Sequence, residues 1–150
     1  AVMKADAYGN GIALLMPAVI AAGIDTVAIT SNDEAQVARG LGYRGRLLRI
    51  RTATPDELED GLALGIEELV GNPDVAARLA ALWQRRGPAA ALPVQLALNS
   101  GGMSRNGIEL AHAAGQAAAR AVLAQAGLAI SGVMTHFPGE DAADILGQLQ

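Results

Sequence analysis

Residues 26–34 read Thr-Val-Ala-Ile-Thr-Ser-Asn-Asp-Glu, and this stretch combines a strand signal with the start of a helix. The apolar run over 26–29 is typical of a buried strand. Ser31 and Glu34 have capping-box spacing, in which the hydroxyl accepts an orphan backbone N–H and the carboxylate accepts the N–H of the capping residue. We therefore predict a strand at 26–29 and a helix that begins just after Ser31.

The same strand-and-helix signal recurs along the chain. Runs that predict strands begin at residues 1, 26, 47, 68, 94 and 129, so successive starts are 25, 21, 21, 26 and 35 residues apart. Gaps of this size fit parallel strands joined by helices and are too long for hairpins. The other helix starts are predicted at Thr54-Pro55-Asp56-Glu57, at Asn72-Pro73-Asp74 and at Asn106-Gly107-Ile108-Glu109, the last opening a helix from Ile108 through His112 to Gln125 that Gly127 ends.

Two architectures accommodate about six such units. An open doubly wound sheet would have a glycine-rich phosphate loop after its first strand, and the sequence contains neither G-x-G-x-x-G nor G-x-x-x-x-G-K-[ST]. A (β/α)8 barrel needs eight units and roughly 250 residues. The predicted fold is therefore α/β, a TIM (β/α)8 barrel truncated to about six units, in a chain expected to be a fragment because it starts within a strand and ends within a helix.

Composition excludes several classes of protein. The 150 residues are 51% hydrophobic and 17% charged, which predicts a globular domain rather than a disordered segment. A net charge of −4 argues against binding nucleic acid or an anionic membrane by charge. No apolar run approaches the ~18–20 residues of a membrane span. The absence of cysteine excludes a disulfide scaffold, a thiolate nucleophile and a Cys-ligated zinc.

The basic residues single out one position. Ten of the 11 are arginines, and the one lysine is Lys4, directly after the apolar run Ala1-Val2-Met3. In barrels of this kind function gathers on the loops that follow the strands. A partly desolvated amine there can form a Schiff base with an aldehyde, as in the anchoring of pyridoxal phosphate. The alternative is that Lys4 only extends to solvent from a strand end.

Three segments at predicted strand ends read Ala1-Val2-Met3-Lys4-Ala5-Asp6-Ala7-Tyr8-Gly9-Asn10-Gly11, Asn99-Ser100-Gly101-Gly102-Met103-Ser104-Arg105-Asn106-Gly107 and Met134-Thr135-His136-Phe137. In this order they resemble the cofactor-lysine motif, the Met-x-Arg-x-Gly segment after the fifth strand and the Thr-His-Phe at the end of strand six in the alanine racemase family. The resemblance covers essentially the whole chain, but only the front part of the family's catalytic barrel.

The resemblance implies a role for each matching residue. Lys4 would bind pyridoxal phosphate and act as one of two bases at the substrate α-carbon. Tyr8 would hydrogen-bond the cofactor phosphate, Arg105 would donate to its phenolic oxygen, and His136 would lie beside its pyridine ring. Two-base proton transfer is coherent chemistry, because a proton returned to the opposite face inverts the carbon centre.

One departure from the family bears on Arg105. Alanine racemases commonly have a carbamylated lysine late in strand five that orients this arginine, and the corresponding place here holds Leu98 or Asn99. Arg105 therefore needs another partner, either a bound anion or Asn99 itself. Asn99, Met103 and Arg105 are the candidate substrate or anion contacts. The sequence of this segment is more similar to that of the broad-specificity amino-acid racemases than to that of strict alanine racemases.

The resemblance also implies the activity and the partners. The expected reaction is pyridoxal-phosphate-dependent racemisation of amino acids with broad specificity. The family's second base is a tyrosine from the C-terminal domain of the other subunit of a homodimer. Residues 1–150 would then be a partial cofactor-binding barrel domain without the family's C-terminal β domain, inactive alone. A periplasmic location is implied for the broad-specificity type and a cytoplasmic one for the strict type.

Several alternatives stay open. The protein could be a strict alanine racemase, or a non-catalytic barrel that binds pyridoxal phosphate to store or deliver it. His136 with Glu140 and Asp141 does not predict a metal site, because catalytic metal sites usually draw about three protein ligands and often two histidines. Arg49 and Arg51 share one face near the end of their strand. Either one of them reaches the barrel mouth or both form a solvated pair, and neither is assigned.

Overall fold

The computed structural model describes residues 1–87, 89–100, 106–137, 139, 141 and 146. The chain divides into two compact units, residues 1–69 and residues 70–150, which are taken in turn. Across the described residues, no helix is long and apolar enough to cross a membrane.

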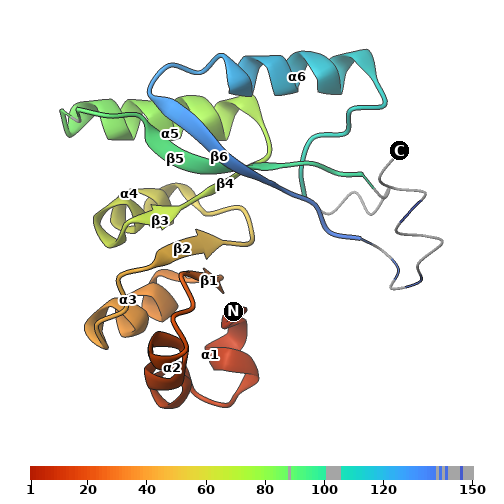
Figure 1. Ribbon diagram of the computed structural model, residues 1–150. Helices are drawn as coiled ribbons and strands as arrows, with labels where there is room; N and C mark the ends of the chain where they lie inside the picture. The colour runs from red at the N-terminus through yellow and green to blue at the C-terminus, as the bar shows by residue number, and fades with distance from the viewer. Residues whose placement is uncertain (88, 101–105, 138, 140, 142–145, 147–150) are drawn as a thin grey trace. The chain divides into compact units, whose positions relative to one another are not determined.

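The first unit is built on a parallel sheet of β1 (Thr26–Ile29), β2 (Arg46–Arg49) and β3 (Ile66–Glu67), in that order (Figure 1). Its helices are α1 (Lys4–Tyr8), α2 (Ile12–Ala21), α3 (Asn32–Gly40) and α4 (Pro55–Leu64). The run at residues 1–3, predicted as a strand, makes only an isolated bridge from Val2 to Ala28. It is nevertheless fixed to β1, because the Met3 N–H donates to the Ala28 carbonyl at 2.8 Å.

The core of this unit lies between the sheet and its helices. Val27, Ile29 and Leu47 point from alternate strand positions into one buried cluster. That cluster includes Met3 and Tyr43 together with apolar side chains from the helices, namely Ile12, Met16, Val19, Ala35 and Ala38. The buried apolar surface fixes β1 and α3 relative to each other, and the loop between them faces α1.

The predicted helix starts of this unit are confirmed. Ser31 accepts the Glu34 N–H at 3.1 Å, and the Glu34 carboxylate accepts the Ser31 N–H at 3.2 Å, which completes the capping box. Thr54 and Glu57 form the same arrangement at the start of α4. These boundaries depend on residues three apart, so they are visible in the sequence.

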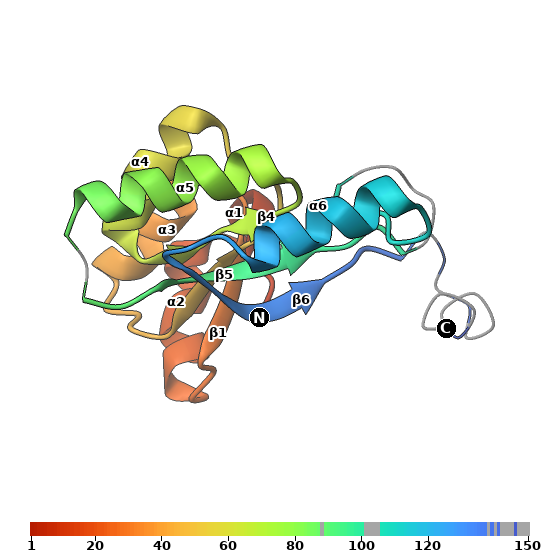
Figure 2. The ribbon, with the colours of Figure 1, turned by 90° about the horizontal axis from the view of Figure 1, so that it is seen from above.

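The second unit contains α5 (Pro73–Arg85), β5 (Leu92–Ala97), α6 (Ala113–Leu123) and β6 (Leu128–Met134), and β4 (Leu69–Val70) is the first strand of its sheet. Strands β5 and β6 are parallel, with a register shift at Val94 and Gln95. Helices α5 and α6 contact each other and lie on the same side of β5 and β6 (Figures 1 and 2). The predicted cap of α5 is confirmed, since Asn72 accepts the Val75 N–H at 2.9 Å.

The helix predicted from Ile108 to Gln125 is wrong at both ends. Ile108 instead forms a parallel bridge with Leu98, and its N–H donates to the Ala97 carbonyl at 2.9 Å. Helix α6 therefore begins only at Ala113, so that His112 is its capping residue rather than an interior one. It ends at Leu123, and Gly127, with φ of +88°, belongs to the turn before β6.

The fold class agrees with the prediction in its main features. The described residues form an α/β chain of six helices and six strands, and the recorded strand pairings are parallel. The strand predicted at 68–70 is β4, and the short β3 precedes it at Ile66–Glu67.

Candidate cofactor-binding site

Lys4 opens one turn of left-handed helix. The φ angles of Ala5, Asp6, Ala7 and Tyr8 are 53, 52, 56 and 55°. For residues other than glycine this conformation costs roughly 1–2 kcal/mol each. Such a turn persists only where the surrounding structure determines it, and strained backbone of this kind is often found at functional sites.

Two polar side chains within the segment stabilise the left-handed turn. The Asp6 carboxylate accepts the backbone N–H of Ile12, the first residue of α2, at 2.7 Å. The Asn10 amide donates to the Ala7 carbonyl at 2.8 Å. The turn also closes on itself, because the Gly11 N–H donates to the Asp6 carbonyl at 2.9 Å. Asp6 and Asn10 therefore explain why the sequence between Lys4 and α2 is polar.

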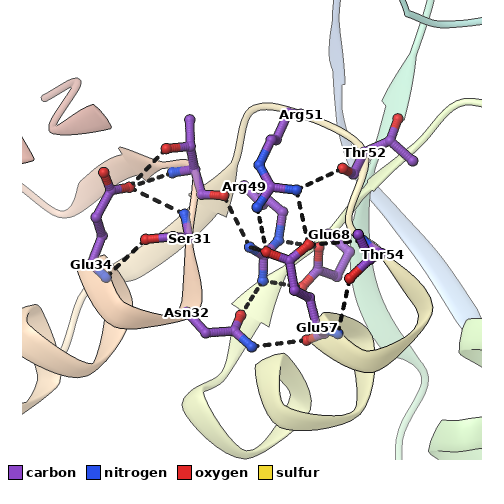
Figure 3. Close-up of polar contacts among 10 residues, drawn as sticks. Ser31, Asn32, Glu34, Arg49, Arg51, Thr52, Thr54, Glu57 and Glu68 are labelled. Carbon is purple, nitrogen blue, oxygen red and sulfur yellow. Dashed lines mark hydrogen bonds and ion pairs between the residues drawn. The ribbon is translucent and has the colours of Figure 1, made fainter. Parts of the chain in front are cut away.

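Glu34 joins this turn to the loop between β1 and α3. One of its carboxylate oxygens accepts the Asp6 N–H at 3.3 Å, and the other accepts the Thr30 N–H at 2.6 Å. Figure 3 shows Glu34 beside Ser31 at the start of α3. The turn is thus connected by a charged side chain to the carboxyl end of β1.

The structure brings Lys4 and Tyr8 together. The Lys4 ammonium lies 5.5 Å from the centre of the Tyr8 ring, within the range of a cation–π contact. The Tyr8 side chain is 63% exposed. Among the described residues, neither the ammonium nor the phenol has a hydrogen-bond or ion-pair partner. One amine and one phenol therefore stand adjacent and available on a fixed turn.

In the second unit, the segments that hold Asn99 and His136 follow adjacent parallel strands. Asn99 comes two residues after β5, and its N–H donates to the Ile108 carbonyl at 2.9 Å. His136, which is exposed, comes two residues after β6. Between them the hydroxyls of Ser100 and Thr135 are 2.8 Å apart. Met103 and Arg105 lie outside the described residues, so their predicted roles stay predictions.

Sequence reasoning missed a buried polar cluster that the structure places at the end of β2. Arg49, left open as one of a solvated pair, has 0% exposure. Its guanidinium donates to both oxygens of Glu68, at 2.7 and 3.1 Å, and to the Thr30 carbonyl at 3.2 Å. It also donates to Asn32 (Figure 3). The solvated-pair interpretation is therefore wrong for Arg49.

The cluster continues through Arg51 and Glu57. Arg51 is half-buried and pairs with Glu57, and this contact lowers the pKa of the Glu57 carboxyl to about 2. Burial raises the pKa of Glu68, and the bonds from Arg49 oppose that rise. The pair continues the parallel register of β2 and β3, in which Leu48 lies beside Glu67, and the sequence alone does not give that register.

Helix α4 approaches this ion pair closely at Gly61. A Cβ at that position would lie 2.7 Å from a Glu68 carboxylate oxygen and 3.3 Å from an Arg49 guanidinium nitrogen. The helix can therefore cover the pair only because residue 61 has no side chain. Arg49 and Glu68 support the strand ends next to the candidate site, and they make no hydrogen bond or ion pair with Lys4 or Tyr8.

Comparison with known proteins agrees with the motifs. Residues 1–150 match the family model described as alanine racemase, N-terminal domain. The chain is 49% identical over 149 residues to the broad specificity amino-acid racemase of Vibrio parahaemolyticus and 48% identical over 150 residues to that of Pseudomonas taetrolens. It is 41% identical over 142 residues to the lysine racemase of Proteus mirabilis. These alignments cover 99%, 100% and 95% of the chain, but only 36%, 36% and 34% of the relatives.

Solved structures show the same fold. An alanine racemase from Clostridium difficile superposes with a TM-score of 0.87 at 21% identity, over 99% of this chain and 41% of that one. The alanine racemase from Streptomyces lavendulae superposes with a TM-score of 0.79 at 26% identity, over 99% of this chain and 39% of that one. The present chain thus spans well under half the length of these proteins.

Proposed function

Because the chain belongs to the alanine racemase N-terminal domain family, we propose that it is the cofactor-binding barrel portion of a pyridoxal-phosphate-dependent amino-acid racemase. In this proposal its six strands are part of a (β/α)8 barrel, and a C-terminal domain outside residues 1–150 completes the active site of a homodimer. The broad-specificity type is favoured, since relatives with 45–50% identity are named broad specificity amino-acid racemases.

The observation that supports this proposal most directly is the pairing of Lys4 with Tyr8 on the left-handed turn. The fit to pyridoxal phosphate is chemical, because an amine suits its aldehyde and an exposed phenol suits its phosphate. Neither group is engaged by another described side chain. When bound, the cofactor supplies an electron sink for the pair left at the amino-acid α-carbon.

The remaining residues have distinct proposed tasks. Lys4 holds the cofactor, then takes and returns the α-proton on one face of the substrate. Tyr8 donates to the phosphate, Arg105 to the phenolic oxygen, and His136 lies beside the ring. Asn99, Met103 and Arg105 would contact an anion or the substrate carboxylate. The base on the opposite face comes from the partner subunit in this proposal.

Activity of the full-length protein tests the proposal. With pyridoxal phosphate added, we expect loss of optical rotation from L-alanine, L-lysine and L-arginine, and Lys4→Ala should abolish it because no other amine of this segment can take its place. Arg120→Ala, at an exposed position of α6, serves as the control and should leave the rate unchanged.

The outcomes separate the alternatives. Turnover of L-alanine alone would favour a strict alanine racemase. Cofactor binding without turnover of any of the three amino acids would favour a barrel that stores or delivers the cofactor. Full activity of Lys4→Ala would contradict the assignment of Lys4.

A further inference from the structure

We propose that Glu34 is a positioning residue for Lys4 and Tyr8, because its carboxylate links the left-handed turn to the carboxyl end of β1. The proposal rests on the proposed function, in which Lys4 and Tyr8 bind the cofactor. Glu34 itself contacts neither of them. It contacts the backbone of Asp6, which lies between the two.

The contacts of Glu34 exceed what capping a helix requires. A capping box needs the Glu34 N–H on Ser31 and the carboxylate on the Ser31 N–H, and both bonds are present. The same carboxylate oxygen also accepts the Thr30 N–H at 2.6 Å and the Thr30 hydroxyl at 3.1 Å. Three donors from the loop after β1 therefore fix this oxygen. The second oxygen is left to face α1.

That second oxygen accepts the backbone N–H of Asp6, which has no hydrogen-bond acceptor within the turn. The first N–H groups of a helical turn have no acceptor within it. Glu34 provides one for Asp6, whose N–H donates to it at 3.3 Å. The other polar groups of Asp6 bond forward along the chain, its carbonyl to Gly11 and its carboxylate to Ile12. The Glu34 contact is therefore the bond that joins Asp6 to the segment that follows β1.

The strain in the turn makes this bond consequential. Four consecutive residues other than glycine have φ between 52 and 56°, and each would relax to negative φ if it were released. Relaxation at Asp6 would change the separation and direction of Lys4 and Tyr8, which flank it. Groups that bind two ends of one ligand must keep their spacing, so a mobile turn would weaken cofactor binding.

Two substitutions separate positioning from capping. Glu34→Gln keeps the size of the side chain, and glutamine also serves in capping boxes. With its one carbonyl oxygen on Thr30 and Ser31, it turns an NH2 donor toward the Asp6 N–H. Ser31→Ala does the reverse, since it removes the cap of α3 and leaves the Glu34 carboxylate in contact with Asp6.

The experiment uses the full-length protein with each substitution. Hydrogen–deuterium exchange of peptides covering residues 3–12 is measured without cofactor, and pyridoxal phosphate affinity is measured by titrating visible absorbance. For Glu34→Gln we expect faster exchange in this segment and a higher Kd for pyridoxal phosphate. Each change should be roughly tenfold, which corresponds to the loss of one charge-assisted hydrogen bond. Ser31→Ala should lower the melting temperature and leave both quantities as in the wild type.

A third variant tests charge against reach. Glu34→Asp keeps the negative charge but is one methylene shorter, so it cannot contact Thr30 and Asp6 at once, and it should behave as Glu34→Gln does. The proposal would be overturned if Glu34→Gln or Glu34→Asp kept the exchange and the cofactor affinity of the wild type. It would also be overturned if Ser31→Ala changed both quantities as much as Glu34→Gln does. Failure of the wild-type protein to bind pyridoxal phosphate would instead overturn the proposed function, and the exchange data would still decide whether Glu34 orders the turn.

Discussion

At the scale of the residue, the stability of the first unit depends on the buried ion pair between Arg49 and Glu68. Both side chains are fully buried, and two hydrogen bonds join them. Removing one partner of such a pair leaves an uncompensated buried charge. The pair escaped sequence reasoning because an arginine near a strand end is usually solvated, whereas here Glu68, between β3 and β4, and Asn32 of α3 both bind its guanidinium.

Arg49→Met should therefore destabilise the protein strongly. We expect a loss of about 3–5 kcal/mol in the free energy of unfolding, because Glu68 is left buried without its counter-ion. Chemical denaturation of the full-length protein measures it. Arg46→Met is the comparison, since Arg46 also pairs with a glutamate, Glu67, but its own side chain is 46% exposed, and it should cost less than Arg49→Met. Equal losses in the two variants would contradict the role of burial.

The lowered pKa of Glu57 makes the stability of the fold depend on pH in acid. Its pKa falls from an ordinary 4.5 to about 2 in the folded protein, chiefly through the bond from Arg51. A carboxyl with a lowered folded pKa stabilises the fold above its unfolded pKa, and that contribution is lost as the pH falls toward the folded value. Denaturation midpoints between about pH 4.5 and about pH 2 should therefore decline less steeply in Glu57→Gln than in the wild type. Identical slopes would show that Arg51 does not hold the carboxylate.

At the scale of the element, local signals were readable and tertiary ones were not. The starts of α3 and α4 were predictable because a capping box depends only on residues three apart. The start of α6 was not predictable, because Ile108 forms a bridge with Leu98. Residues 108–112, which look helical in the sequence, therefore form a loop before the helix. The left-handed turn after Lys4 was missed for a related reason. Its conformation is strained and depends on Asp6, Asn10 and Glu34 rather than on intrinsic preference.

Gly61 shows how a helix and an ion pair constrain each other. Alanine is the better helix former by about 1 kcal/mol. At Gly61, however, its Cβ would lie 2.7 Å from a Glu68 oxygen. We expect Gly61→Ala to destabilise the protein by about 1–3 kcal/mol in thermal or chemical denaturation, as overpacking does. At Gly40 of α3 a Cβ meets nothing within 4 Å, so Gly40→Ala should be neutral or stabilising. Stabilisation by both substitutions would rule out the close contact.

At the scale of the whole molecule, the site was predictable in part. Lys4 and Tyr8 were identified from a motif, and the structure places them in contact. Glu34 was identified only as a helix cap, because its second contact joins residues 28 positions apart in the sequence. Asn99 and His136 follow adjacent strands, as predicted. The chain spans about a third of the length of its racemase relatives.

Residues 1–150 expressed alone should therefore fail to racemise amino acids. In the proposed function the second base comes from the partner's C-terminal domain, and two bases are needed to invert the α-carbon. The assay follows optical rotation of L-alanine, L-lysine and L-arginine with added pyridoxal phosphate, beside the full-length protein. Turnover comparable to that of the full-length protein would contradict the two-base assignment.

Covalent mapping of the bound cofactor tests whether Lys4 is the residue that holds pyridoxal phosphate. The full-length protein is incubated with pyridoxal phosphate, reduced with borohydride to fix any amine-bound cofactor, digested and analysed by mass spectrometry. We expect the added mass to lie on the peptide that contains Lys4, and to be lost from this peptide in Lys4→Ala. Cofactor mass on another lysine of the full-length protein, with the Lys4 peptide unmodified, would contradict it.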